Sequence, residues 1–102
     1  MNIWASLILW ENADPKTDRI VRETESEKLT IAFVPSVDAA AKVAFELVDH
    51  GAELIELCGG FGLDDGAKVS KAVAVRAAVG TVSFGIESLT PAAAYKAKFE
   101  AQ

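Results

Sequence analysis

The residues of this chain that could carry out chemistry gather in one stretch, Cys58-Gly59-Gly60-Phe61-Gly62. Three glycines within four positions permit a tight turn and let a ligand approach the backbone amides closely. A helix after such a turn adds free N–H groups and a dipole that favours an anion, and such amides also stabilise a carbonyl or oxyanion. We therefore expect these residues to bind a small molecule, anionic or carbonyl-bearing, through Gly59, Gly60, Phe61 and Gly62.

The same stretch also fits a simpler role, that of a turn from a strand into a helix. It is neither a dinucleotide-binding fingerprint nor a P-loop, because no Gly-Lys-Ser/Thr sequence follows it. Instead, Leu63-Asp64-Asp65 places two carboxylates where a phosphate site would have none. In this interpretation Asp64 and Asp65 only cap the helix.

Cys58 and Glu56 are the candidates for catalysis. A thiol between a strand and a helix-opening turn can have a lowered pKa and act as a nucleophile. Glu56 lies near the end of the strand, where burial would raise the pKa of its carboxyl and make it an acid or base. Alternatively, Cys58 packs as a small hydrophobic residue and Glu56 pairs with a lysine. The only histidine, His50, is expected at the opposite end of the sheet, so neither a Cys-His dyad nor a usual zinc site is expected within one chain.

The hydrophobic pattern predicts the elements that position these residues. Apolar runs with aromatic and β-branched residues predict strands at 3–10, 29–34, 54–58 and 81–86, and a hairpin arm at 19–24. Helical spacing and capping residues predict helices over 37–49, from 65 to 80, and from Thr90 onward. Residues 3–10 are nearly all apolar, which is typical of a strand covered on both faces.

The order strand, helix, strand, helix, strand between residues 29 and 86 makes two consecutive βαβ units, which have parallel strands and right-handed crossovers. We expect residues 1–102 to form a single α/β domain: a mostly parallel sheet of about four main strands, with helices on one or both faces and a C-terminal helix. In such sheets ligands bind outside the carboxyl ends of the strands. That rule adds Asn12, Ser36 and Glu87 to the expected ligand-binding residues.

Charge and cysteine content limit the classes of partner and the compartment. The formal net charge is −5, and basic and acidic side chains are interleaved, so nucleic acid would be repelled. No apolar run approaches the roughly 20 residues that span a bilayer, and the first residues lack the positive segment of a signal peptide. A single cysteine cannot form an internal disulfide, which favours a reducing, cytoplasmic location. No pattern identifies a cofactor.

The chain is rich in apolar residues for its size. Hydrophobic residues occupy 51% of its 102 positions, and a small domain cannot hide that much apolar surface in its own core. We therefore expect a homo-oligomer with a buried subunit interface. Alanine-rich helices that pack closely on the sheet are the alternative explanation.

The stretch 29–86, and above all Glu56-Leu57-Cys58-Gly59-Gly60-Phe61-Gly62, resembles a family of small bacterial proteins of unknown function. Its members are similar in an early apolar strand and in a turn like Ala13-Asp14-Pro15. The resemblance implies that residues 56–62 are the signature of the family, and it implies no reaction. Leu63-Asp64-Asp65 departs from the Pro-Glu that relatives tend to have.

Three functions are compatible with these patterns. The leading hypothesis is a homo-oligomeric domain that binds a small molecule around residues 58–62. The second is an enzyme that acts on a small acyl or carbonyl compound, with Cys58 as nucleophile or Glu56 as acid/base. The third is a structural or accessory oligomeric subunit.

Overall fold

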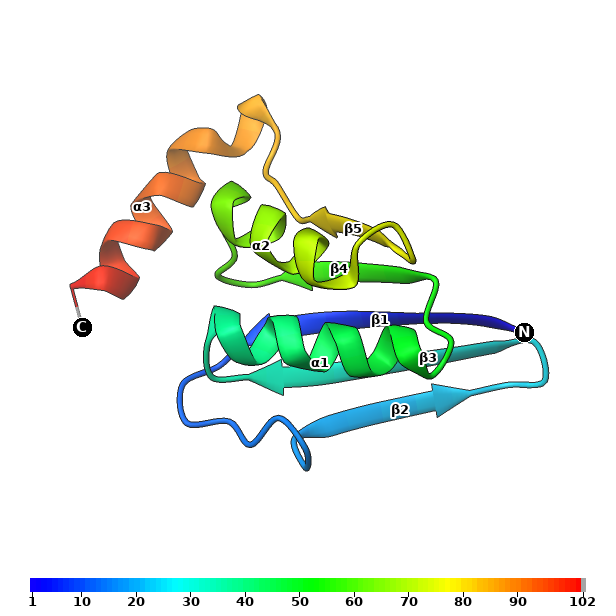
Figure 1. Cartoon of the computed structure of the whole chain (residues 1–102). Coiled ribbons are helices and arrows are strands. Elements are labelled where there is room, and N and C mark those ends of the chain that lie inside the picture. The colour runs from blue at the N-terminus through cyan, green and yellow to red at the C-terminus, as the bar shows by residue number, and fades with distance from the viewer. Residues whose placement is uncertain (102) are drawn as a thin grey trace.

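The structure is a computed structural model and describes residues 1–101. Its elements follow one another in this order: β1 (Asn2–Leu9), β2 (Arg19–Glu23), β3 (Glu27–Val34), α1 (Val37–Asp49), β4 (Leu54–Cys58), α2 (Leu63–Val73), β5 (Ala78–Thr81), the short 3-10 helix η1 (Ile86–Ser88) and α3 (Leu89–Glu100). The units β3-α1-β4 and β4-α2-β5 are the two predicted βαβ units, and the α/β class is confirmed (Figure 1).

The five strands form one sheet in the order β2-β3-β1-β4-β5. β1 lies between β3 and β4 and pairs with both in parallel, and β5 continues the sheet parallel to β4. Only β2 is antiparallel, because it forms the hairpin with β3 that the sequence predicts. The mostly parallel sheet is therefore confirmed, with this hairpin arm as its fifth strand.

Both α1 and α2 lie on the same face of the sheet (Figure 1). The crossovers from β3 to β4 and from β4 to β5 advance in the same direction across the sheet, so right-handed connections put both helices on one side. The core lies between this face and the helices; its fully buried larger side chains are Leu7, Val34, Ile55, Leu57, Val69 and Val73. The expectation that β1 is covered on both faces is wrong, because no element of residues 1–101 packs on the other face.

Two predicted boundaries are also wrong. α2 ends at Val73, well before Gly80, because Ala74 leaves the helical region with a φ of 57°. The last strand is then Ala78–Thr81 instead of 81–86, with Val79 packed against the core. α1 and its cap agree with the prediction: Ser36 accepts a hydrogen bond from the N–H of Ala39 (3.1 Å).

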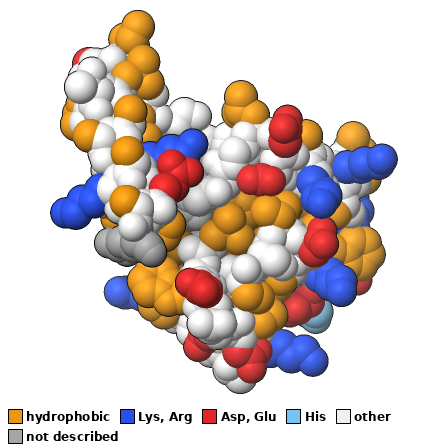
Figure 2. Space-filling model, turned by 90° about the vertical axis from the view of Figure 1, so that its left-hand side faces the viewer, with side chains coloured by type: hydrophobic (Ala, Val, Ile, Leu, Met, Phe, Trp, Pro, Cys, Tyr) orange, Lys and Arg blue, Asp and Glu red, His pale blue; other side chains and the backbone are white. Residues whose placement is uncertain are grey.

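α3 stands apart from the rest of the domain, as a separate lobe (Figure 2). It begins at Leu89, one residue before the predicted cap Thr90. None of its residues is buried, and its aromatic side chains Tyr95 and Phe99 are each 66% exposed. Among residues 1–101, no helix is long and apolar enough to cross a membrane.

Candidate functional site

The glycine turn, residues 58–62, begins where β4 ends and leads directly into α2. The N–H of Leu9 in β1 donates to the carbonyl of Gly59 (3.2 Å), which extends the pairing of the two strands by one residue. Gly59 and Gly60 then adopt φ values of 77° and 92°, in the region that L side chains rarely adopt. The predicted tight turn is therefore present at the carboxyl end of β4.

The turn also needs glycine because it passes close to β1. A Cβ on Gly59 would lie 3.2 Å from Cγ2 of Ile8, and a Cβ on Gly60 would lie 3.2 Å from Cβ of Leu9. Both distances are shorter than the ordinary contact of about 3.5–4.0 Å between carbon atoms. The backbone amides of the turn are consequently not screened by side chains of their own residues.

The hydrogen bonds of the turn separate its amides into two groups. The N–H of Gly62 donates to Oδ2 of Asp65 (2.8 Å), so Asp65 caps α2, as the simpler interpretation of the stretch predicts. The N–H groups of Gly59, Gly60 and Phe61, in contrast, donate to no acceptor within residues 1–101. Three consecutive amides are thus available to a ligand oxygen at the end of the strand.

Glu56 and Cys58 lie on the face of the sheet that the helices leave uncovered. Ile55 and Leu57 are buried under the helices, so their neighbours in β4 point to the opposite side. There Glu56 pairs across the sheet with Ser6 of β1, and both are half-buried. Among residues 1–101 no lysine or arginine forms an ion pair with Glu56, and Cys58 is a free, half-buried thiol.

The three other predicted ligand-binding residues have different surroundings. Asn12 is exposed in the loop after β1, with a φ of 65°. The hydroxyl of Ser36 caps α1. Glu87 follows not a strand but the extended segment after β5: it lies in η1, and its carboxylate is close to Gly85. The structure therefore does not bring Glu87 to the end of a strand as predicted, because β5 already ends at Thr81.

The carboxylates with clearly shifted pKa values lie away from the glycine turn. Two hydrogen bonds of 3.1 Å from the Arg19 guanidinium lower the pKa of Glu46. The backbone N–H of Lys16 (2.9 Å) lowers that of Asp14. His50 directly follows α1, and its Nδ1 lies 2.7 Å from the carbonyl oxygen of Glu46. It therefore lies before the start of β4, whereas Cys58 lies at the end of that strand. Within residues 1–101 no three His, Cys, Asp or Glu side chains are grouped so as to hold a metal ion.

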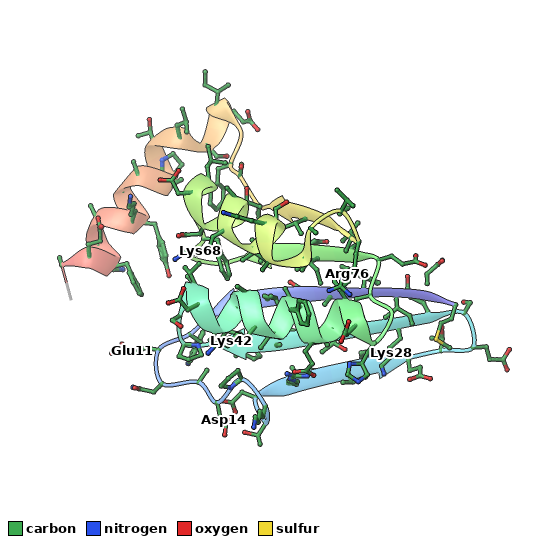
Figure 3. All side chains as sticks on the ribbon, in the orientation of Figure 1. Glu11, Asp14, Lys28, Lys42, Lys68 and Arg76 are labelled. Carbon is green, nitrogen blue, oxygen red and sulfur yellow. The ribbon has the colours of Figure 1, made fainter. Side chains whose placement is uncertain are left out.

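Two shallow hollows of the described surface lie away from the glycine turn. One, of about 300 Å³, lies between α1 and α2 and is lined by Ala41, Lys42, Phe45 and Ala72. The two helices are joined there by ion pairs: Lys68 with Asp38 (3.2 Å) and, just after α2, Arg76 with Asp49 (2.9 Å) (Figure 3). The other hollow, of about 510 Å³, lies on the uncovered side of β2 and β3.

The sequence analysis did not predict which face of the sheet is left uncovered, nor that this face is apolar. In β3 the side chains of Leu29, Ile31 and Phe33 point to this face, while Thr30, Ala32 and Val34 point to the helices. Because both sets are largely apolar, alternation does not show which face is covered. The signal that was present is the high apolar content of the chain.

Comparison with known proteins places the chain in a family. The model of a family described as "Family of unknown function (DUF6506)" matches residues 2–97. The chain belongs to this family. The match covers all five strands and most of α3. No curated protein and no solved structure gives a significant match.

Proposed function

We propose that this member of the family binds a small, neutral, carbonyl-bearing molecule at the glycine turn. The observation that carries the proposal is the run of three N–H groups, those of Gly59, Gly60 and Phe61, without an acceptor within residues 1–101. Free backbone donors are suited to a carbonyl oxygen. The turn follows a parallel strand, at the edge of the sheet where ligands bind in such folds.

The charges around the turn favour a neutral ligand over an anionic one. Asp64 and Asp65 lie in the first turn of α2, and the Asp65 carboxylate already accepts the N–H of Gly62 that would otherwise face an anion. The chain as a whole carries a net charge of −5. A phosphate would meet these negative charges, whereas a ketone or amide oxygen would not.

The test is a titration of the ¹⁵N-labelled full chain, observed by NMR. N-methylacetamide and cyclohexanone serve as neutral carbonyl probes, and inorganic phosphate serves as the anionic probe. We expect the amide signals of Gly59, Gly60 and Phe61 to shift with at least one neutral probe, and not with phosphate. Unchanged signals with both neutral probes, or shifts with phosphate alone, would refute the proposal.

An enzyme that acts on a small acyl or carbonyl compound is the second candidate. It is favoured by the position of Cys58, whose thiol immediately precedes the free amides, and of Glu56, whose half-buried carboxylate lies two residues earlier on the same face. Cys58 would attack the carbonyl carbon while the amides stabilise the oxyanion, with Glu56 as acid or base. A reducing, cytoplasmic location is part of both candidates, because it keeps Cys58 a thiol.

Thiol reactivity tests the second candidate. The rate at which iodoacetamide alkylates Cys58 in the folded protein is compared with the rate in urea-unfolded protein at the same pH. An activated nucleophile reacts faster in the folded chain than in the unfolded one. A slower reaction in the folded chain assigns Cys58 to packing and rejects its role as nucleophile.

A further inference from the structure

The uncovered face of the sheet is apolar over its central strands. Its larger side chains are Trp4 and Ile8 of β1, Leu29, Ile31 and Phe33 of β3, Ile20 of β2 and Leu54 of β4. Arg22, Glu27 and Glu56 carry charge among the paired positions on this side of the sheet. A contiguous apolar patch of more than a few hundred Å² on a protein surface marks an interaction site.

The dimensions of the sheet give the area of this face. Five strands about 4.8 Å apart span about 24 Å, and the eight residues of β1 or β3 span about 26 Å. Because β2 and β4 have only five residues and β5 has four, the mean strand length is about 20 Å and the face measures about 480 Å². Two such faces together bury about 950 Å², close to the roughly 1,000 Å² that a specific interface needs. A second copy of the chain thus offers a surface of the right size and the same chemistry.

The C-terminal helix of the same chain is too small to be the cover. α3 has 12 residues, so it is about 18 Å long and about 10 Å wide. Its footprint is less than half of the face. In addition, its contacts within residues 1–101 are chiefly with η1, which holds it away from the sheet.

Side-chain size differs between the two edges of the face and indicates how two copies fit together. The β2 edge carries the bulky Ile20 and Arg22, whereas the β5 edge carries only Ala78 and Gly80, at the matching levels of the register. Nothing lies within 4 Å of the place where a Cβ on Gly80 would be. A two-fold axis along β1 puts each β2 edge over the partner's β5 edge, so that large side chains meet small ones.

The same axis also brings opposite charges to the same half of the interface. Arg22 belongs to β2 and Glu56 to β4, on opposite sides of β1. Rotation about β1 exchanges the two sides, so Arg22 and Glu27 of one copy both lie over the half that holds Glu56 of the other, and the arginine lies between glutamates of both copies. A two-fold axis perpendicular to the strands would instead stack β2 on the partner's β2 and bring the two copies of Arg22 close together.

We propose that two copies of this chain associate through their uncovered sheet faces, about a two-fold axis that runs along β1. This dimer does not depend on the ligand proposed above, but it buries the face that carries Glu56 and Cys58 and is therefore an alternative to the enzyme candidate. It buries Trp4, Ile8 and Ile31 of both copies and places Ile20 of each in the space above Gly80 of the other.

Two adjacent residues of β2 provide a matched test. Ile20 and Val21 are equally exposed, at 51% and 53%, but pair with Ile31 and Thr30 and so lie on opposite faces. Ile20→Asp puts a carboxylate into the proposed interface, whereas Val21→Asp puts it on the helix side. Because both side chains are about half-exposed in one chain, both variants are expected to fold, which far-UV circular dichroism verifies.

Sedimentation velocity measures the mass of each protein from about 1 to about 100 µM. We expect the wild type and Val21→Asp to sediment at twice the chain mass of 10.8 kDa. Ile20→Asp is expected to raise the dissociation constant by roughly 100-fold or more, because the new carboxylate is buried without a partner. A monomeric wild type at the highest concentration overturns the proposal. Dissociation of both variants, or of neither, overturns it as well.

Discussion

Gly66→Ala tests how closely α2 packs against β5, directly after the glycine turn. A Cβ on Gly66 would lie 2.8 Å from Cγ2 of Thr81 and 4.0 Å from Cδ1 of Leu57. The first distance is shorter than real Cβ contacts, and the second is an ordinary one. Gly66 lies within α2, so its substitution changes helix propensity and packing together.

The two effects have opposite signs. Alanine in a helix interior is more favourable than glycine by about 1 kcal/mol. Against this, the contact with Thr81 must be relieved, either by rotation of its side chain or by separation of α2 and β5, and an overpacked core typically costs about 1–3 kcal/mol. We therefore expect Gly66→Ala to lower the free energy of unfolding by about 1 kcal/mol in net terms, despite the better helix former.

The assay is urea unfolding followed by circular dichroism, at one fixed protein concentration. Thr81→Ser removes Cγ2, so the double variant Gly66→Ala/Thr81→Ser should recover most of the loss. The double-mutant cycle is expected to give a coupling of about 1 kcal/mol. If Gly66→Ala is more stable than the wild type by about the full 1 kcal/mol of helix propensity, or if the effects of the two single variants simply add, the close packing of α2 on β5 is refuted.

Two further predictions concern the turn and an ion pair. Gly60→Ala should destabilise the chain by about 1–3 kcal/mol, because its φ of 92° is unfavourable for alanine. Gly80→Ala, where φ is not positive and no atom of the same chain lies within 4 Å of the added Cβ, should leave stability within about 0.5 kcal/mol when both variants are compared in the Ile20→Asp background, in which nothing packs over Gly80; urea unfolding that finds equal losses for Gly60→Ala and Gly80→Ala would contradict the role of the turn. Glu46→Gln should cost up to about 1 kcal/mol at neutral pH. Arg19 lowers the pKa of Glu46 in the folded chain. The stabilisation of the folded chain by this ion pair is therefore complete above the ordinary glutamate pKa and is lost as the pH falls through the lowered value. Unfolding curves of both proteins should therefore converge in acid, and a difference that persists there would show that the charge is not the cause.

Local sequence patterns predicted the elements that have clear end signals. Ser36 starts α1, and strand 54–58 runs into the glycine turn as expected. The end of α2 was not predictable, because the sequence from Val69 to Val79 contains no glycine or proline that would mark a helix end, while the backbone turns at Ala74. Where apolar spacing fits both a helix and a strand, packing against the core decides the boundary.

Part of the candidate site was predictable, because local sequence signals mark the end of the strand and the turn that follows it. The positions of Gly59, Gly60 and Cys58 follow from the strand-turn-helix order, which local sequence encodes. Glu87 was misplaced because its predicted position depended on the length of the last strand. Side-chain geometry decides that the carboxylate of Asp65 accepts a hydrogen bond from the N–H of Gly62, while the N–H groups of Gly59, Gly60 and Phe61 have no acceptor within residues 1–101.

The sequence by itself therefore determined an α/β domain of βαβ units with a glycine turn after its fourth strand. Only the tertiary structure decided that both helices cover one face, and that Glu56 and Cys58 lie on the other. The reason is physical: β1 and β3 are apolar on both sides, so their pattern is compatible with a cover on either. The covered side follows from strand order and crossover handedness, which are set by contacts between residues far apart in the chain.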